Sequence, residues 1–283
     1  MTFKKVGVVG CGLMGRGIAE VSAKSGYDVV VSEINKELLE KGLGAIDQSL
    51  AKAVEKGKMA AADKDRIIGK IKGTIDMGDF KGCDIVVEAA IENLELKKKI
   101  FNDLDKICAP QAILSTNTSC LSVMDMAAAT RRPDRVVGCH FFNPVPVMQL
   151  LEVVKTITTS KATLDEAVEW GKSLGKTIVI APDRPGFIVN RAFMPYMIEA
   201  FEMYEQGVAT REDIDTGVKL GLNHPMGPLT LADMVGLDTL LFVIDAIYAE
   251  TRNPKFVAPV LLRKMVAAGH LGRKTGKGFY DYR

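Results

Sequence analysis

Residues 4–15 read KKVGVVGCGLMG, a short apolar run that ends in a glycine-rich turn. The β-branched residues within 4–9 are typical of a strand buried in a parallel sheet, and residues 13–25 have the pattern of a helix. The first glycine permits a tight turn, the second lets the backbone approach a pyrophosphate, and the third lets the helix pack on the strand. The N-terminus of the helix then favours an anion. We therefore expect a dinucleotide to bind at Gly10, Gly12, Leu13, Met14 and Gly15.

A carboxylate after the second expected strand refines this prediction. Glu33 follows residues 28–32, DVVVS. A carboxylate there can accept hydrogen bonds from the ribose hydroxyls of adenosine and repels a 2′-phosphate, so the pattern predicts NAD rather than NADP. Three spaced glycines also recur by chance. The alternative is a glycine-rich turn that serves only packing, with Glu33 as a solvated charge at a strand end.

Strands and helices alternate through the first half of the chain. The further strands expected there are residues 84–89, 113–115 and 135–140. The helices expected between the strands are residues 36–57, 62–72 and 93–108, the last with Asn93 as its N-cap. This alternation is typical of βαβ units and a mostly parallel sheet.

The pattern changes from Gln149 onward. Strands are expected at 149–154, 155–159 and 177–180 around one helix at 163–173, and beyond the APDRPG stretch only helical periodicity is found. We therefore expect an α/β chain with two domains. Residues 1–184 would form a Rossmann-like, doubly wound, mostly parallel sheet with a helical insertion at about 36–72, and residues 185–283 would form an all-helical C-terminal domain.

Composition narrows the classes of function. The 283 residues carry a formal net charge of +2, which argues against a nucleic-acid-binding arm or a basic membrane patch, and 25% are charged as in ordinary globular proteins. No apolar run is long enough to span a membrane, and no signal peptide is recognisable. The five cysteines form no CxxC pair, so we expect a cytoplasmic protein without disulfides and without a metal site.

Candidate catalytic groups follow two of the expected strands. His140 ends one strand, and Glu152 lies on the next, beyond the proline-constrained FFNPVPV loop. If the two strands are neighbours, the carboxylate can fix the tautomer of the imidazole and stabilise its charged form. From spacing alone, two unrelated structural residues are an equal alternative. Residues 115–119, STNTS, follow another strand end, so Asn117 and Ser119 would face the same crevice, or the segment would cap the helix that begins near Leu121.

At these residues the chain resembles the 3-hydroxyacyl-CoA dehydrogenase family, along essentially its whole length. The similar segments include VGVVGCGLMGRGIA, VVEAAIENLELKK, STNTSCLSV, GCHFFNPVPVMQLLEVV, RPGFIVNR, NHPMGPLTLADMVGLD and GRKTGKGFYDY. The resemblance implies a nicotinamide-binding N-terminal domain, a helical C-terminal domain that forms a homodimer, and an active site between the two.

Residue roles follow from the matching motifs only. The resemblance implies His140 as the catalytic base, Glu152 as its partner, and Ser119 and Asn190 as substrate-orienting residues. It implies further NAD contacts at Glu33, Glu92, Lys97, Ser119, Asn143 and Lys274. It implies coenzyme A contacts at Ser49 and Lys56. Lys52, one helical turn before Lys56, and Asn117 and Ser119 of the STNTS segment complete the expected substrate contacts. Cys120 stands where relatives commonly have serine.

The implied reaction is reversible hydride transfer between NAD and C3 of a short 3-hydroxyacyl thioester, with (S)-3-hydroxybutyryl-CoA and acetoacetyl-CoA as the pair. Two alternatives belong to other classes. A dehydrogenase of a free β-hydroxy acid would share the glycine-rich domain but rely on a catalytic lysine. A non-catalytic structural protein could keep the dinucleotide-binding scaffold without the site.

Overall fold

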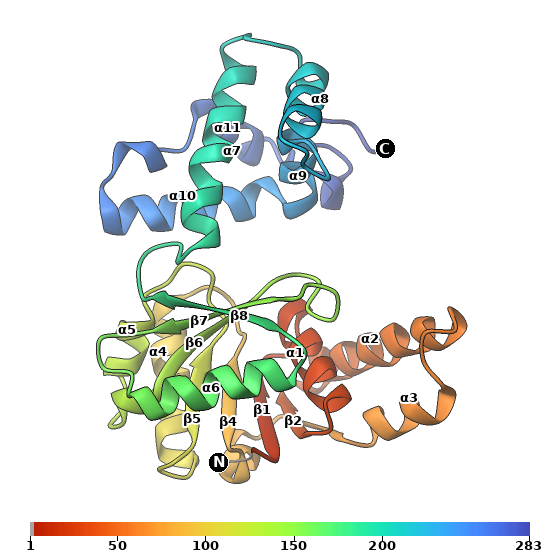
Figure 1. The fold of residues 1–283 in the computed structure, drawn as a ribbon, viewed down its shortest axis with the longest axis vertical. Coiled ribbons are helices and arrows are strands. Elements are labelled where there is room, and N and C mark those ends of the chain that lie inside the picture. Colours follow the sequence, from red (N-terminus) through yellow and green to blue (C-terminus); the bar gives the residue numbers. More distant parts are fainter. Residues whose placement is uncertain (1–2) are drawn as a thin grey trace. The chain divides into compact units, whose positions relative to one another are not determined.

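An eight-stranded sheet organises the first part of the described chain, residues 3–184, with strand order β3-β2-β1-β4-β5-β6-β7-β8 (Figure 1). Among the strands that residues 3–184 contribute to this sheet, only β6 and β7 pair antiparallel. The strands are β1 (Lys5–Val9), β2 (Asp28–Ser32), β3 (Ile71–Thr74), β4 (Ile85–Glu88), β5 (Ile113–Thr116), β6 (Val136–Phe141), β7 (Leu150–Lys155) and β8 (Thr177–Pro182). The computed structural model describes residues 3–283, and these divide into a first unit that ends at Arg184 and a second unit, Pro185–Arg283.

Helices cover both faces of the sheet, which confirms the doubly wound α/β fold predicted from the sequence. On one face, Val6 and Val8 of β1 belong to an apolar cluster with residues of α1 (Leu13–Lys24), α2 (Lys36–Glu55) and α6 (Lys161–Ser173). Gly7 points the other way, where a Cβ would lie 2.7 Å from the ring of Phe80. This alternation is the one expected of a strand that is buried on both sides.

The opposite face is covered by α4 and α5. The helix α4 (Leu94–Ile107) begins where the sequence predicts, because Asn93 accepts a hydrogen bond from the Leu96 N–H at 2.9 Å. The short helix α5 (Val123–Ala128) is capped by Ser122 and not by the STNTS segment before it. The alternative in which that segment serves as the cap is therefore wrong.

The structure corrects the predicted helix at 62–72. The helix α3 is shorter (Ala61–Ile68) and ends at Gly69, and the residues after it form the edge strand β3, parallel to β2. Helix α2 packs closely on this strand, since a Cβ at Gly73 would lie 2.8 Å from Leu43. Glycine therefore permits the packing of α2 on β3, and in Figure 1 α2 and α3 form a helical hairpin beside the sheet.

The predicted strand at 155–159 is also wrong. β7 ends at Lys155, and the threonines after it form a turn in which side chains satisfy the backbone. Thr159 Oγ1 accepts from the Thr156 N–H at 2.9 Å, and Thr156 Oγ1 accepts from the Thr158 N–H at 3.1 Å. Threonine hydroxyls compete with a strand for backbone donors in this way, so β-branching alone gives the wrong prediction here.

The second unit is helical, as the sequence predicts. Its helices are α7 (Val189–Glu205), α8 (Arg211–Gly221), α9 (Pro228–Val235), α10 (Leu237–Thr251) and α11 (Val260–Ala267). The buried carboxylate of Asp233 accepts hydrogen bonds from the Phe279 and Tyr280 N–H groups and fastens the C-terminal segment to α9. Of the helices formed by residues 3–283, none is both long and apolar enough to cross a bilayer.

Candidate active site

The turn between β1 and α1 has the geometry that a pyrophosphate requires. Gly10 has a φ of +93°, which favours glycine. A Cβ at Gly15 would lie 1.9 Å from the Gly10 carbonyl oxygen, so only glycine lets α1 approach the turn. A Cβ at Gly12 would have nothing within 4 Å, and α1 begins immediately after it, at Leu13. The surface above the helix N-terminus is therefore open for an anionic group, and the residues present fit a dinucleotide.

The carboxylate of Glu33 lies beside this turn. Its Oε1 accepts from the Cys11 N–H at 2.7 Å, and its Oε2 accepts from the Ile34 N–H at 3.1 Å. The position at the end of β2 is the one from which an acidic residue contacts a ribose. Burial, with the nearby charge of Glu33 as a second cause, raises the pKa of the Cys11 thiol to about 12, so this thiol stays neutral at pH 7.

His140 and Glu152 are in contact. Antiparallel pairing of β6 with β7 sets the two residues opposite each other in the register. The imidazole Nδ1 lies 2.7 Å from Glu152 Oε2, and the two side chains are 5% and 0% exposed. The structure therefore contains the contact that was expected from the two strands. A buried carboxylate at Nδ1 fixes the tautomer of the ring and stabilises the imidazolium.

Asn117 and Phe142 contact the strand end that carries His140. Asn117 is buried, and its Oδ1 accepts from the Phe141 N–H at 2.9 Å, so this atom ties the end of β5 to β6. The ring of Phe142 packs at 4.5 Å from the His140 ring, between centroids. Asn117 was expected among the substrate contacts. The structure shows its oxygen in a hydrogen bond within the protein.

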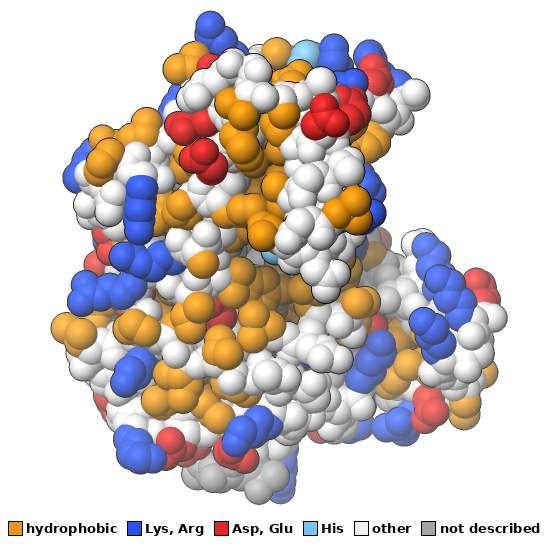
Figure 2. Space-filling model, turned by 45° about the horizontal axis from the view of Figure 1, so that its top comes forward, with side chains coloured by type: hydrophobic (Ala, Val, Ile, Leu, Met, Phe, Trp, Pro, Cys, Tyr) orange, Lys and Arg blue, Asp and Glu red, His pale blue; other side chains and the backbone are white. Residues whose placement is uncertain are grey.

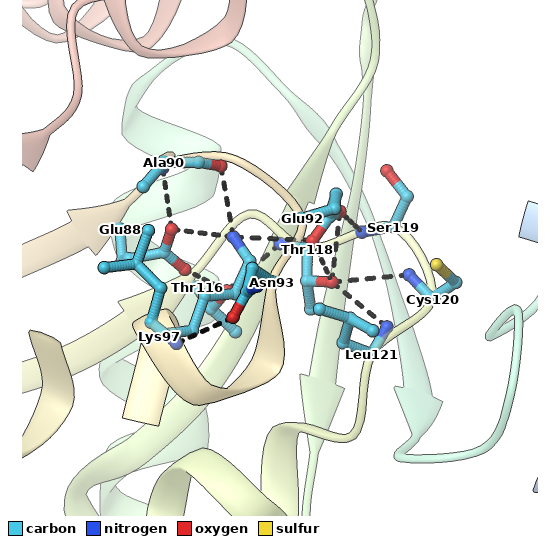
Figure 3. Close-up of polar contacts among 11 residues, drawn as sticks. Glu88, Ala90, Glu92, Asn93, Lys97, Thr116, Thr118, Ser119, Cys120 and Leu121 are labelled. Atoms are coloured by element: carbon cyan, nitrogen blue, oxygen red, sulfur yellow. Dashed lines mark hydrogen bonds and ion pairs between the residues drawn. The ribbon is translucent and has the colours of Figure 1, made fainter. Parts of the chain in front are cut away.

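Ser119 belongs to a hydrogen-bonded network after β5 (Figure 3). Glu92 accepts from the Ser119 N–H at 2.8 Å and from the Thr118 hydroxyl at 2.9 Å. Lys97 donates to Glu88 at 2.7 Å, and its Nζ lies 3.4 Å from Glu92. The ammonium of Lys97 thus lies between two carboxylates, one of which holds the backbone of Ser119.

Glu88 is a member of this network that the sequence analysis missed. It is fully buried at the end of β4 and accepts from Lys97, from the Ala90 N–H and from the Thr116 hydroxyl. Three donors satisfy the charge, as burial requires. A carboxylate that ends a buried apolar strand, IVVE, was a signal that could have identified it. Lys97 is 1% exposed, so its side chain is packed inside the protein at the position that the resemblance assigns to a cofactor contact.

The residues expected to bind coenzyme A lie along α2. Ser49 lines a cavity of about 190 Å³ together with Leu13, Arg16 and Asn143. Lys52 and Lys56 are exposed, and Lys56 is the C-cap of α2, which ends at Glu55 and not at residue 57. Figure 2 shows Lys and Arg side chains gathered over the α2–α3 hairpin, at the right of the view. This basic surface beside a cavity suits a phosphorylated ligand.

Two further candidate residues belong to the second unit. Asn190 is half-buried in the first turn of α7. Lys274 lies in the short helix η4 (Arg273–Thr275) and forms an ion pair with Asp238 of α10.

Comparison with known proteins identifies the family. The family model described as "3-hydroxyacyl-CoA dehydrogenase, NAD binding domain" matches residues 5–184, and the model of the C-terminal domain of the same family matches residues 186–282. A probable 3-hydroxybutyryl-CoA dehydrogenase of Deinococcus radiodurans is 48% identical over 98% of this chain and 100% of the relative. The 3-hydroxybutyryl-CoA dehydrogenase of Clostridioides difficile is 45% identical over 98% of this chain and 99% of the relative.

A solved structure has the same fold throughout. The crystal structure of (S)-3-hydroxybutyryl-CoA dehydrogenase PaaH1 from Ralstonia eutropha superposes with a TM-score of 0.96 at 45% identity, and covers all of both chains. The chain belongs to the 3-hydroxyacyl-CoA dehydrogenase family, with its NAD-binding domain followed by its C-terminal domain.

Proposed function

We propose that the protein catalyses the reversible NAD-dependent interconversion of (S)-3-hydroxybutyryl-CoA and acetoacetyl-CoA. The observation that carries this proposal is the buried His140–Glu152 pair at the end of β6. Strand ends of this kind face the ligand crevice in doubly wound folds. The names of the relatives supply the substrate, and the glycine turn with Glu33 supports NAD as the cofactor.

His140 moves the proton in this reaction. Glu152 holds Nδ1, so Nε2 is the nitrogen that takes the proton of the C3 hydroxyl during oxidation and returns it during reduction. The carboxylate stabilises the imidazolium formed in the first of these steps. When it is bound, the nicotinamide accepts or supplies the hydride at C3.

Ser119 and Asn190 would orient the substrate and stabilise its developing charge. Hydrogen-bond donors aimed at the oxygen where charge accumulates stabilise the transition state more than the ground state. The backbone of Ser119 is held by Glu92, which limits the movement of this residue. A donor that is already fixed requires little reorganisation during the reaction.

The cofactor preference is tested with NADH and NADPH. We expect kcat/KM with acetoacetyl-CoA to be at least about tenfold higher for NADH, because the Glu33 carboxylate repels a 2′-phosphate. Lys36 weakens this repulsion little, since its side chain is 81% exposed and its ammonium lies 3.6 Å from Glu40. Glu33→Gln should narrow the ratio. Equal values for the two cofactors in the wild-type protein would contradict the role given to Glu33.

Lys56 is expected to bind a phosphate of coenzyme A. Lys56→Ala should raise KM for acetoacetyl-CoA by about tenfold or less at low ionic strength, because one partly solvated charged contact is lost. The phosphates are remote from C3, so ground and transition states lose the same contact and kcat should hardly change. The effect should shrink with added salt.

Lys106→Ala provides the matched control for this measurement. Lys106 is another helical lysine, 62% exposed and close to Asp103 in α4. Its replacement should leave KM unchanged. If Lys56→Ala also leaves KM at the wild-type value at low ionic strength, Lys56 is an ordinary solvated surface residue and does not bind a phosphate of coenzyme A.

The second unit is proposed to form a homodimer. Several large apolar side chains are exposed on it, and Figure 2 shows hydrophobic side chains on the surface at the top of the view. They include Leu220, Leu222, Met234, Phe242, Val257 and Val260. Exposed large apolar side chains are typical of a protein interface when they lie together. A sedimentation measurement should give twice the mass of the chain, whereas a monomer at micromolar concentration would contradict the proposal.

A reducing compartment, and so the cytoplasm, is the proposed location. All five cysteines are buried. Burial raises the pKa of the Cys139 thiol to about 12. Cysteines that pack in the core as apolar side chains are typical of proteins that form no disulfides.

A further inference from the structure

Lys176 is a buried lysine that the proposed mechanism does not use. It lies just before β8 and is 9% exposed. Its ammonium donates to the carbonyl oxygen of Val145 at 2.6 Å and to that of Met148 at 2.8 Å. Burial, with the charge of Lys24 as a second cause, lowers the pKa of Lys176. Both acceptors belong to the segment that connects His140 on β6 to Glu152 on β7.

The acceptors lie in one tight turn, residues 144–148. The N–H groups of Val147 and Met148 both donate to the Pro144 carbonyl oxygen, each at 2.9 Å. In a turn of this kind, the carbonyl groups that accept no backbone hydrogen bond point in one direction. A cation placed at their oxygen atoms satisfies them. Lys176 therefore supplies the partner that the turn cannot supply for itself.

The same turn also packs against α1. The side chain of Val145 is buried, and a Cβ at Gly17 would lie 2.9 Å from the Cβ of Val145. Gly17 is in the first turns of α1, directly after the glycine turn that is expected to bind the cofactor. The turn at 144–148 is thus held between the ammonium of Lys176 and the helix at the dinucleotide site.

This turn forms a wall of the cavity that contains Ser49. Asn143 and residues 144–147 line it opposite residues of α1 and α2. The cavity measures about 190 Å³, so a displacement of one wall by a fraction of an ångström changes which groups fit. Asn143, one of the expected cofactor contacts, immediately precedes the turn.

We propose that Lys176 is a positioning residue, which holds the turn at 144–148 in the place where it shapes the cavity that contains Ser49. The identity of the ligand in that cavity rests on the proposed function, whereas the placement of the turn does not. Lys176 does not line the cavity itself but holds one of its walls through two carbonyl oxygens. We therefore expect its replacement to weaken ligand binding in the cavity and not to change proton transfer at His140.

The test compares Lys176→Met with Lys172→Met. Methionine keeps the apolar stem but leaves two carbonyls without their donor. Lys172, by contrast, is 58% exposed on α6 and forms an ion pair with the exposed residue Glu169. Hydrogen exchange of residues 143–149 and the steady-state constants for acetoacetyl-CoA are measured for both variants. Lys176→Met should make the amides of Val147 and Met148 exchange about tenfold faster and raise KM about tenfold, with kcat within about threefold of wild type. Lys172→Met should change neither quantity.

A second variant covers the case in which Lys176→Met does not fold. Lys176→Gln keeps N–H donors on a shorter side chain, so it should loosen the turn less and raise exchange and KM by about threefold each. Wild-type exchange at residues 143–149 in a folded variant would overturn the proposal. Faster exchange with an unchanged KM, or a fall in kcat alone, would also overturn it. The hydrogen-exchange measurement needs no substrate and therefore tests the placement of the turn independently of the reaction. If the wild-type protein fails to reduce acetoacetyl-CoA, that result refutes the proposed function but not the placement of the turn.

Discussion

His140→Ala is expected to lower kcat by about 10²–10⁴-fold while leaving the affinity for NADH nearly unchanged. General acid–base catalysis contributes a factor of this size, and no other residue on the end of β6 can exchange a proton near neutral pH. The imidazole is buried against Glu152 at the end of β6, whereas the cofactor is expected to bind at the turn between β1 and α1. Removing the ring should therefore affect the reaction and not the binding of the dinucleotide.

Steady-state reduction of acetoacetyl-CoA and fluorescence titration with NADH measure these two effects. His270→Ala is the control, because His270 follows α11 in the second unit and is assigned no role in the reaction. It should retain wild-type kcat. A loss of less than tenfold in His140→Ala would show that another group transfers the proton.

Glu152→Gln is expected to produce the second-largest loss, about 10²-fold in kcat. The glutamine amide fits the same space and can hydrogen-bond to Nδ1, so the packing of β6 on β7 should survive. It can donate an N–H to Nδ1, however, which places the ring proton on Nε2 and leaves the wrong tautomer for a base. It also removes the negative charge that stabilises the imidazolium.

Circular dichroism and thermal unfolding show whether Glu152→Gln keeps the fold, because Glu152 is fully buried. Glu169→Gln serves as the control, since Glu169 is 71% exposed on α6. Its kcat should equal that of the wild type. If a folded Glu152→Gln variant has a kcat within about threefold of wild type, Glu152 contributes to packing and not to proton transfer by His140.

Much of the site could be predicted because it depends on short-range pattern. The glycine turn follows β1 directly. Gly10 has a positive φ, Gly12 leaves the surface at the helix N-terminus open, and Gly15 lets the backbone approach closely. The contact of His140 with Glu152 depends only on two consecutive strands pairing antiparallel, since that places residues at the two ends of one connection opposite each other. Neither prediction requires knowledge of distant packing.

The features that escaped prediction depend on contacts between distant segments. The strand β3 is a four-residue segment, IKGT, which becomes a strand because it pairs with β2 and because α2 packs on Gly73. The ion pair of Lys97 with Glu88 joins α4 to the end of β4, and neither its existence nor the burial of Lys97 can be inferred from the sequence around Lys97. The preference of a short segment for helix or strand says nothing about which strand it pairs with or which distant residue it contacts.

The contacts of Lys176 beside the proposed binding cavity could not be predicted from the sequence for the same reason. In the sequence it is one lysine in the turn between a helix and a strand, where basic residues are common. Its burial results from the packing of the 144–148 turn between β8 and α1, which brings together segments separated by more than a hundred residues. Only the folded arrangement identifies its acceptors.

The most direct test of the proposed function is the consumption of NADH with acetoacetyl-CoA and, separately, with free acetoacetate at the same concentration. We predict rapid turnover with the thioester and little with the free acid, because the cavity at Ser49 and the lysines of α2 would bind the coenzyme A portion that the acid lacks. Turnover of acetoacetate without turnover of acetoacetyl-CoA would contradict the proposal and identify a dehydrogenase of free β-hydroxy acids.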